Sequence, residues 1–236
     1  MSVDWLDVLI PAALETLKIS VIAAVLSAVV GFLAALGCLS RRRTLRGACR
    51  AYIEVLRAIP LLVLLILAYY GLGERLEAWH IGAFTVAVVV LVANEGAYTA
   101  EVYRSALLSI DRGQWHAGAS LGLSERQTLR LVVLPQFARI ALQPTVNMLI
   151  YVIKGSALAS LITVEELTLV SQRLVAETFQ PLEVYLMAGA IYLLITMPLG
   201  YLVYFIGGRV DKRVKTGAGP RPRVRLGLRG LGARQA

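Results

Sequence analysis

Polar side chains that could bind a solute are embedded in the long apolar runs of this 236-residue chain. In the run at residues 81–108, Asn94, Tyr98 and Glu101 are four and then three positions apart and therefore share one helix face. Glu95 lies beside this face, deeper in the run and without a sequence-local partner. Because a charge at the bilayer centre costs about 2.5–3.5 kcal/mol on insertion scales, such residues normally face protein or a water-filled cavity. Asn94, Glu95 and Tyr98 are therefore candidates for lining a substrate path.

A second polar group lies in the run at residues 137–163, where Lys154 and Ser156 begin a seam of polar side chains. Lys154 could neutralise a carboxylate of the earlier run, or it could meet the carboxylate of a passing solute. We leave both interpretations open and add Lys154 and Ser156 to the candidate path. Gly155, between them, permits close packing or a local break in the helix.

Two acid–base pairs at i, i+3 spacing lie near the ends of apolar runs. Residues at this spacing are neighbours on a helix surface, so Glu101 with Arg104 and Glu54 with Arg57 are predicted to be structural ion pairs. Pro60 is predicted to kink its helix, because proline lacks a backbone donor and clashes with the preceding turn.

The sequence carries none of the residue patterns that are typical of an enzyme. It holds only two histidines, and it contains no Ser/His/Asp set, no metal-ligand cluster and no Gly-x-x-x-x-Gly-Lys-Ser/Thr nucleotide loop. Cys38 and Cys49 give neither a disulfide framework nor metal spacing. We therefore expect a non-enzymatic chain without catalytic residues, metal ligands or a cofactor of its own.

Composition places these residues in a membrane. Hydrophobic side chains make up 58% of the chain, against about 45–50% in soluble domains, and the mean hydropathy is +0.70. The apolar runs exceed the roughly 20 residues that cross a bilayer. The net charge of +9 does not indicate nucleic-acid binding, because the basic residues cluster beside apolar runs, as membrane anchors do.

We expect an all-α integral membrane protein with five transmembrane helices. A transmembrane domain is predicted over residues 1–208 and a basic, disordered tail, rich in Gly, Pro and Arg, over residues 209–236. Asp4 and Asp7 stand where a signal peptide would carry positive charge, so the first helix is expected to be retained. The expected helices lie at about residues 12–39, 52–72, 81–108, 137–163 and 184–206.

Loop charges predict the orientation of these helices. Residues 41–50 hold five arginines and no acid, and the tail holds nine basic residues and one acid, whereas the loops after the second and fourth helices are acidic. Positive loops remain in the cytoplasm. The N-terminus is therefore expected outside, in the periplasm, and the C-terminus and the loop at residues 111–135 inside.

The cytoplasmic loop is predicted to fold into two short helices at an angle. Asp111 with Gln114 and Ser124 with Gln127 both match the capping-box spacing. Gly122 lies where the first helix must end and can adopt a left-handed conformation without a side-chain clash. The second helix then continues to the proline at the membrane entry. The loop is thus expected to present a compact knob to the cytoplasm.

Two interpretations of the first short helix remain open. Trp115 could anchor a partner protein, or it could anchor the helix on the bilayer surface. Small side chains, which let another backbone come close, follow it at Ala117, Gly118, Ala119 and Ser120.

With these features in place, the chain resembles the permease subunits of ATP-binding-cassette (ABC) importers, specifically the polar amino acid uptake family that includes histidine, glutamine and arginine permeases. The family's loop pattern is Glu-Ala-Ala, three residues, Gly, nine residues, then Ile-x-Leu-Pro. At matching spacing this chain has His116-Ala117-Gly118, then Gly122, then Val132-Val133-Leu134-Pro135.

Further family motifs occur in the same order along the chain. The family's Arg-Gly-Thr-Pro appears as Arg57-Ala58-Ile59-Pro60, and its Ala-Tyr-x-x-Glu-x-x-Arg appears as Ala97-Tyr98-Thr99-Ala100-Glu101-Val102-Tyr103-Arg104. Its Gly-Gln is Gly113-Gln114, and its Leu-Pro-Gln is Leu134-Pro135-Gln136. Its Lys-Asp-Thr-Ser-Leu corresponds to Lys154-Gly155-Ser156-Ala157-Leu158.

The resemblance implies a permease subunit in the inner membrane of a prokaryote. Implied partners are an ABC ATPase dimer that holds ATP-Mg, a second permease copy or homologue, an external solute-binding protein and membrane lipid. Polar amino acids or related solutes are the implied substrates. The alternative is a self-contained channel or secondary transporter. The implied ATPase-coupling residues are Gly113, Gln114, Trp115, His116, Ala117, Gly118, Leu121 and Gly122.

Among the positions that depart from the family pattern, three bear on the proposed roles. His116 stands where the family keeps glutamate and Gly118 where it keeps its second alanine, so docking relies on a matched socket or on packing alone. Gly155 replaces the aspartate that follows the lysine of the fourth helix. If that aspartate holds the amino group of the solute, Glu95 could take its place here.

Overall fold

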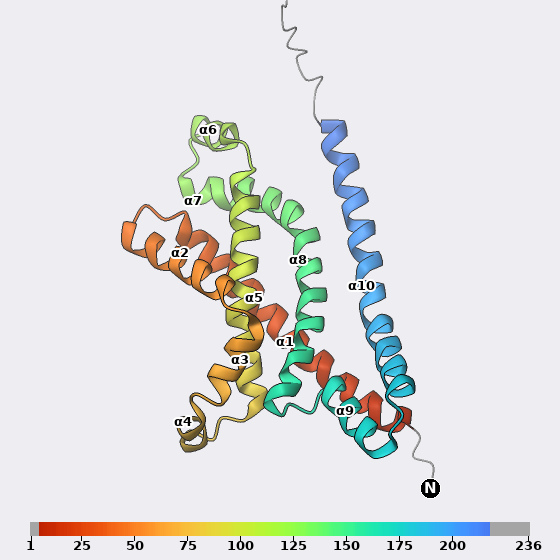
Figure 1. The fold of residues 1–236 in the computed structure, drawn as a ribbon. Coiled ribbons are helices and arrows are strands. Elements are labelled where there is room, and N and C mark those ends of the chain that lie inside the picture. The colour runs from red at the N-terminus through yellow and green to blue at the C-terminus, as the bar shows by residue number, and fades with distance from the viewer. Residues whose placement is uncertain (1–4, 218–236) are drawn as a thin grey trace, which may run out of the picture.

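The computed structural model describes residues 5–217, and the regular secondary structure within them is entirely helical. The elements follow one another as a chain of long and short helices that pack side by side (Figure 1). In chain order they are α1 (Trp5–Cys38), α2 (Arg43–Ala58), α3 (Leu61–Tyr69), α4 (Gly73–Ala78), α5 (Ala83–Leu108), α6 (Arg112–Ser120), α7 (Glu125–Thr128), the π-helical turn η1 (Leu129–Val133), α8 (Leu134–Ser156), the 3₁₀ turn η2 (Ala157–Ile162), α9 (Leu167–Thr178) and α10 (Pro181–Gly217).

Up to five segments of the described chain can cross a membrane. Four are continuous, at Trp5–Cys38, Ala83–Leu108, Glu125–Ile162 and Pro181–Leu202, and the bent pair of α2 and α3 is the fifth. Helices suit this environment because each satisfies its backbone hydrogen bonds within its own segment. The prediction of an all-helical protein with about five apolar spans is confirmed.

The second span differs from its prediction. We expected one kinked helix over residues 52–72, but α2 ends at Ala58 and α3 begins at Leu61, and the two are bent by 99°. Pro60 is the N-cap of α3 rather than a residue inside a helix. Ile59, which precedes it, is extended at φ −92° and ψ 128°, as steric clash with a following proline favours. The proline therefore ends one helix and starts another.

The fourth predicted span lies within a longer helical segment, Glu125–Ile162, because α7, η1 and α8 follow one another without a break. One further boundary was predicted wrongly. The last helix runs on to Gly217, so residues 209–217 are helical and not disordered. Lysine and arginine are good helix formers, and glycine commonly ends a helix. Residues 218–236 of the predicted tail lie outside the described residues.

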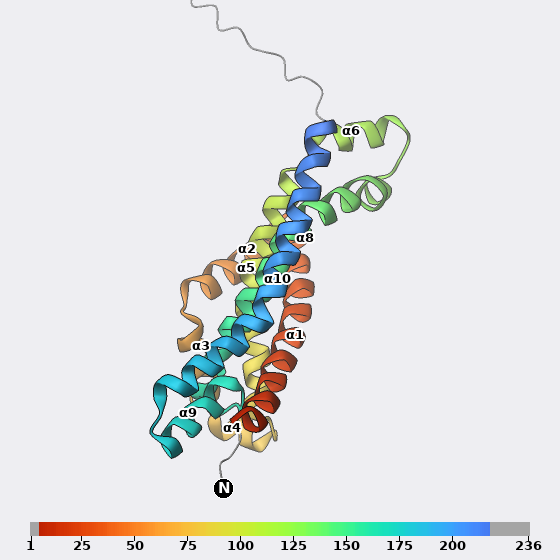
Figure 2. The same ribbon diagram turned by 90° about the vertical axis from the view of Figure 1, so that its right-hand side faces the viewer.

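The helices of the described chain pack around four apolar clusters, the smallest of which joins α1, α2 and α5 through Cys38, Ile53 and Ala100. A central cluster joins α1, α3, α5 and α8 through Ile19, Leu65, Leu91 and Val152. A second, which includes Tyr103 and Phe137, lies toward α6, and a third, which includes Leu9 and Leu174, lies toward α9. The N-terminal end of α1 lies with α4 and α9 at one end of the molecule, and α6 lies at the other end, from which it projects sideways (Figures 1 and 2).

Candidate functional site

The knob, which we define as residues 111–128 with α6 and α7, is built largely by local caps. Asp111 accepts a hydrogen bond from the backbone N–H of Gly113, with 2.5 Å between nitrogen and oxygen. Ser124 and Gln127 form the complete reciprocal capping box that the sequence predicts. The reciprocal bond from Gln114 to Asp111 does not form; the Gln114 Oε1 instead accepts from the Gln136 Nε2 at 3.0 Å. That contact ties α6 to the start of α8.

Gly122 forms the corner of the knob. Its φ is +75°, a left-handed backbone conformation that side chains rarely tolerate, and open space surrounds the position of a Cβ atom there. The predicted left-handed turn is thus present. It leaves Leu121 80% exposed at the tip of the knob. An isolated apolar side chain at such a tip is well placed to enter a pocket on another protein.

Trp115 supports the knob from behind. Its side chain is half-buried and packs against the apolar cluster that contains Tyr103, Val133 and Phe137. We had left open whether Trp115 anchors a partner or the bilayer surface, and the structure gives it a third role, as the anchor of α6 on its own protein. Leu121, rather than Trp115, is the exposed apolar side chain of the knob.

Gly118 permits the close contact between α6 and α7. It is buried, and a Cβ atom added to it would lie 2.5 Å from the Oγ1 and 2.6 Å from the Cγ2 of Thr128. At such distances the Thr128 side chain or one of the two helices must shift. Glycine at residue 118 thus suits the threonine at residue 128, where even alanine would be tight.

Three side chains outside the predicted coupling set also hold the knob. The guanidinium of Arg41, just after α1, lies 2.5 Å from a carboxylate oxygen of Glu125, although both are exposed. The Gln136 amide reaches Gln114 and also donates to the carbonyl of Val132 at 3.1 Å. Gln136 belongs to the Leu-Pro-Gln motif, so the sequence marked its position but not its role. Arg41 and Glu125 carry no comparable signal.

The π-helical turn before α8 accommodates the Leu134-Pro135 motif. Pro135 occupies the first turn of α8, where a missing backbone N–H is tolerated best. The wider turn over Leu129–Val133 lets the chain continue from α7 into α8 without a break. Residues Leu134 and Pro135 thus join the knob to the fourth span as one helical segment.

The polar face of α5 meets the break in the second span. Asn94, only 3% exposed, donates from its Nδ2 to the backbone carbonyl of Leu56 at 2.8 Å. The Tyr98 hydroxyl donates to the carbonyl of Arg57 at 3.3 Å. Both residues were predicted to line a substrate path, but their polar atoms are bound to the end of α2.

One of the two predicted ion pairs is present. Arg104 binds Glu101 with two hydrogen bonds, of 2.9 Å from Nε and 2.5 Å from Nη2. Glu54 and Arg57, by contrast, form no ion pair within the described chain; the Arg57 guanidinium lies over the ring of Tyr98, 5.2 Å from its centroid. Arg57 also lines a cavity of about 340 Å³ with Arg50, Glu54 and Glu101, between α2, α5 and the end of α1.

Glu95 is the remaining polar group in the middle of α5. It is 9% exposed, and within the described chain its carboxylate has no hydrogen-bond or ion-pair partner. A Cβ atom added to Gly155 would lie 3.9 Å from its Oε1. Lys154 is exposed and forms no ion pair with α5 in the described residues, so the neutralisation we had considered does not occur. Ser156 is buried and bonds to the Ile153 carbonyl at 2.8 Å.

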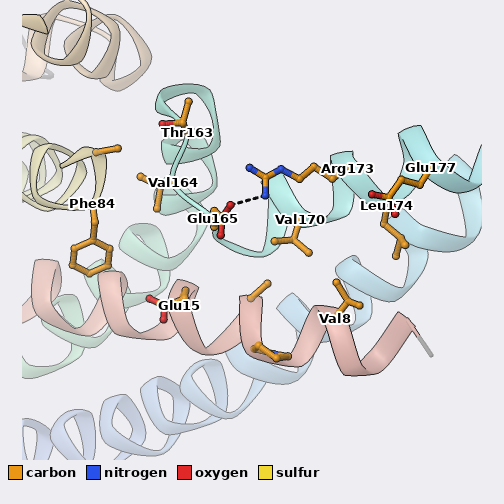
Figure 3. Close-up of a pocket in the computed structure, with 13 residues that line it drawn as sticks. Val8, Glu15, Phe84, Thr163, Val164, Glu165, Val170, Arg173, Leu174 and Glu177 are labelled. Atoms are coloured by element: carbon orange, nitrogen blue, oxygen red, sulfur yellow. Dashed lines mark hydrogen bonds and ion pairs between the residues drawn. The ribbon is translucent and has the colours of Figure 1, made fainter. Parts of the chain in front are cut away.

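At the end of the molecule opposite the knob, a cavity of about 610 Å³ opens between α1, α9 and the start of α5. Figure 3 shows the apolar side chains of Phe84 and Val170 at its walls, with Glu15 pointing in from α1. Arg173 and Glu165 pair at 2.6 Å on the α9 side of the cavity. With Glu177 the lining holds three carboxylates and one guanidinium, and Glu15 is also paired with Lys18 at 2.6 Å, so the cavity is weakly acidic.

Glu166, beside this cavity, forms a cluster that we call the outer clamp. It is 0% exposed and caps α9, its Oε1 accepting from the Leu169 N–H at 3.0 Å. Its Oε2 accepts from the Tyr192 hydroxyl of α10 at 3.0 Å and lies 3.4 Å from the Thr16 hydroxyl of α1. Burial raises the pKa of Glu166 above its ordinary range, and hydrogen bonds from Thr168, Leu169 and Tyr192 oppose that rise. In the sequence, Glu166 is one of the acidic residues of the loop after the fourth predicted helix, and no local pattern marks its role.

The spans, the knob and the motifs together define a multi-pass transport subunit. The family described as binding-protein-dependent transport system inner membrane component matches residues 27–216, and the chain belongs to this family.

Named relatives and a solved structure lie close to the chain within this family. The glutamine transport system permease protein GlnP of Escherichia coli is 36% identical over 226 residues, covering 91% of this chain and 99% of GlnP. The probable amino-acid ABC transporter permease protein YckA of Bacillus subtilis is 38% identical over 177 residues, covering 75% of this chain and 77% of YckA. A crystal structure of an amino acid ABC transporter with histidines matches with a TM-score of 0.80 at 32% identity, covering 89% of this chain and all of that one.

Proposed function

We propose that this chain is the permease subunit of an ATP-driven importer of polar amino acids or closely related solutes. It works in the inner membrane of a prokaryote, with its N-terminus outside and the knob in the cytoplasm. A separate ATPase dimer binds ATP-Mg and supplies the energy, and an external binding protein delivers the solute. The observation that carries the proposal is the knob itself, a rigidly supported corner at Gly122 with Leu121 exposed at its tip.

The construction of the knob suits the transmission of force. Trp115 packs α6 against the apolar cluster of the membrane domain, and Gly118 packs it closely against Thr128 of α7. Gln114 bonds it to Gln136 of α8. The side chains of His116 and Leu121 remain exposed. A displacement of the tip by a bound ATPase would therefore be transmitted to α5 and α8 together, and would not be absorbed by a flexible loop. His116 contributes no fixed negative charge there, so the socket is expected to hold the tip by packing.

A pair of such subunits forms the complete pathway. Up to five spans are few for an enclosed channel, and α10 presents Leu193, Leu194 and other large apolar side chains on its exposed surface. These side chains require lipid or a second permease subunit as a neighbour. The acidic cavity at the opposite end, with Glu15 and Glu177, faces the side from which the binding protein delivers the solute.

Glu95 is the residue of this chain that we assign to the amino group of the solute. Glu95 is 9% exposed, and its carboxylate oxygens are not among the fully buried, unpartnered polar atoms of the described chain, so the unpaired carboxylate keeps some access to a ligand. A charged side chain at this depth is typical of functional groups in membranes. Gly155, which replaces the family's aspartate, lies directly beside it. An aspartate at residue 155 would place a second carboxylate against Glu95. We infer that the site needs one carboxylate, which α5 carries in this chain and α8 carries in the family.

The experiment has two stages. A tagged chain, solubilised in mild detergent from its native cells, should co-purify with an ATPase subunit; purification without one would refute the importer assignment. In reconstituted vesicles supplied with the binding protein, Glu95→Gln should lower uptake of labelled polar amino acids about tenfold. The double variant Glu95→Gln with Gly155→Asp, which returns the carboxylate from the neighbouring helix, should recover most of it. Unchanged uptake and substrate preference in Glu95→Gln would remove Glu95 from the pathway.

A further inference from the structure

The break in the second span leaves a backbone carbonyl without its helical donor. In an uninterrupted α-helix the carbonyl of Leu56 would accept from the N–H of residue 60, four positions on. Residue 60 is proline, which has no N–H to donate. A backbone carbonyl without a hydrogen-bond donor is costly in a membrane interior, because no water molecule is there to replace the missing donor.

Asn94 supplies the missing donor. Its side-chain Nδ2 lies 2.8 Å from the Leu56 oxygen, and Asn94 is nearly fully buried. One turn farther along α5, the Tyr98 hydroxyl donates to the next carbonyl, that of Arg57, at 3.3 Å. The Tyr52 hydroxyl of α2 donates in the opposite direction, to the Ala93 carbonyl of α5 at 2.7 Å. The broken end of α2 is thus bound to one short stretch of α5.

α5 also carries the knob. It runs without interruption from Ala83 to Leu108, and Asp111, three residues later, caps α6. Asn94 lies about 20 Å along this rod from the end of α5, at 1.5 Å per residue. A displacement of the knob therefore reaches the break in the second span through one rigid helix and the Asn94 hydrogen bond. The cavity between α2 and α5, with Arg50 and Arg57 in its lining, leaves room for the end of α2 to move.

From this geometry we propose that Asn94 is a positioning residue for transport: its bond to the carbonyl that Pro60 leaves free transmits the movement of the knob to the broken second span. The proposal rests on the importer function proposed above, because it concerns how the ATPase drives the pathway. Asn94 touches no solute in this account. It acts through α2 and α3, whose 99° bend is the element that must change during a cycle.

The test compares Asn94→Ala, Pro60→Ala and the double variant in reconstituted vesicles with the ATPase and the binding protein. Asn94→Ala should lower solute uptake about tenfold while ATP hydrolysis falls much less, so that more ATP is consumed per solute transported. Pro60→Ala restores a backbone donor at residue 60. The loss of thermal stability caused by Asn94→Ala should therefore be smaller in the Pro60→Ala background than in the wild type. Tyr98→Phe, which removes the longer bond of 3.3 Å, is the matched control and should have a smaller effect on both measures.

Two results would overturn the proposal. The first is an unchanged ratio of ATP to solute in Asn94→Ala, which would make the residue merely structural. The second is strict additivity of the stability changes caused by Asn94→Ala and Pro60→Ala, which would mean that Asn94 does not compensate for the donor missing at Pro60. A failure of the importer function itself is distinct, because the wild-type complex would then show no binding-protein-dependent uptake at all.

Discussion

The two ends of this molecule stabilise their helix ends in opposite ways. At the knob, Asp111 and Ser124 cap helices with bonds to residues two or three positions away. At the outer clamp, Glu166 caps α9 and also binds Tyr192, while Thr16, 150 residues earlier in the chain, contacts the same carboxylate. The knob is therefore folded by local caps and is attached to α5 and α8, so that it moves together with them, whereas the clamp ties α1, α9 and α10 together. A transporter that is driven from one side needs both a movable end and a fixed end.

The clamp should give the largest effect on stability. Glu166→Ala would remove the acceptor of the Leu169 N–H and one of the two partners of the Tyr192 hydroxyl, which keeps Thr168 at 3.0 Å. An unsatisfied group costs about 1–3 kcal/mol, so the free energy of unfolding in detergent should fall by roughly that amount. Glu166→Gln, which keeps one acceptor, should lose much less. Equal losses in the two variants, measured by thermal unfolding, would show that the hydrogen bonds do not carry the clamp.

The same residue gives the clamp a pH dependence. Because burial raises the pKa of Glu166, the folded protein retains this proton at pH values where the unfolded chain has lost it. Its contribution to stability is therefore complete in acid and declines as the pH rises from about 4.5 through the raised pKa. Tyr192 is the titratable group that contacts it, and Thr16 and Thr168 are the other polar neighbours. Glu166→Gln should remove this component, and an identical pH profile in wild type and variant would contradict it.

The corner of the knob should come next in size of effect. Gly122→Val forces a β-branched residue into a left-handed conformation that costs an ordinary residue about 1–2 kcal/mol. Uptake should fall about tenfold while the chain remains in the membrane. Gly122→Asn is the matched control, because asparagine tolerates this conformation and space is open around the site. Comparable uptake for the valine and asparagine variants would mean that the corner is not required.

The contact between α6 and α7 should give the smallest of these effects. In Gly118→Ala the added methyl group meets Thr128, so the threonine side chain or one of the helices must shift, at a typical cost of about 1–3 kcal/mol for overpacking. Uptake should decline severalfold, with normal membrane insertion. Thr128→Ala in the same chain removes the two clashing atoms and should recover most of the activity. If the double variant is as poor as Gly118→Ala, the contact with Thr128 does not explain the glycine.

The contrast between the ends also explains what the sequence could predict. The knob depends on capping residues and a glycine corner within one short stretch, and such local signals can be recognised directly in the sequence. The outer clamp depends on a meeting of Thr16, Glu166 and Tyr192, which no local pattern encodes. The sequence predicts a kink at Pro60. The 99° bend and the hydrogen bond from Asn94 depend on how α5 packs against α2, which the sequence does not encode locally. Polar residues in apolar runs were correctly identified as unusual; which of them bind helix ends, as Asn94 does, and which remain unpaired, as Glu95 does, depends on tertiary packing.

Chemical cross-linking from the tip of the knob tests the central claim most directly. In a chain with Cys38→Ser and Cys49→Ser, a cysteine placed by Leu121→Cys should cross-link to the ATPase subunit that co-purifies with the chain, and the link should block uptake. A cysteine placed by Trp115→Cys, on the face that packs against the protein itself, should link far less. Efficient cross-linking at residue 121 with loss of uptake is the result we predict. An ATPase that co-purifies but links to Trp115→Cys and not to Leu121→Cys would contradict the account.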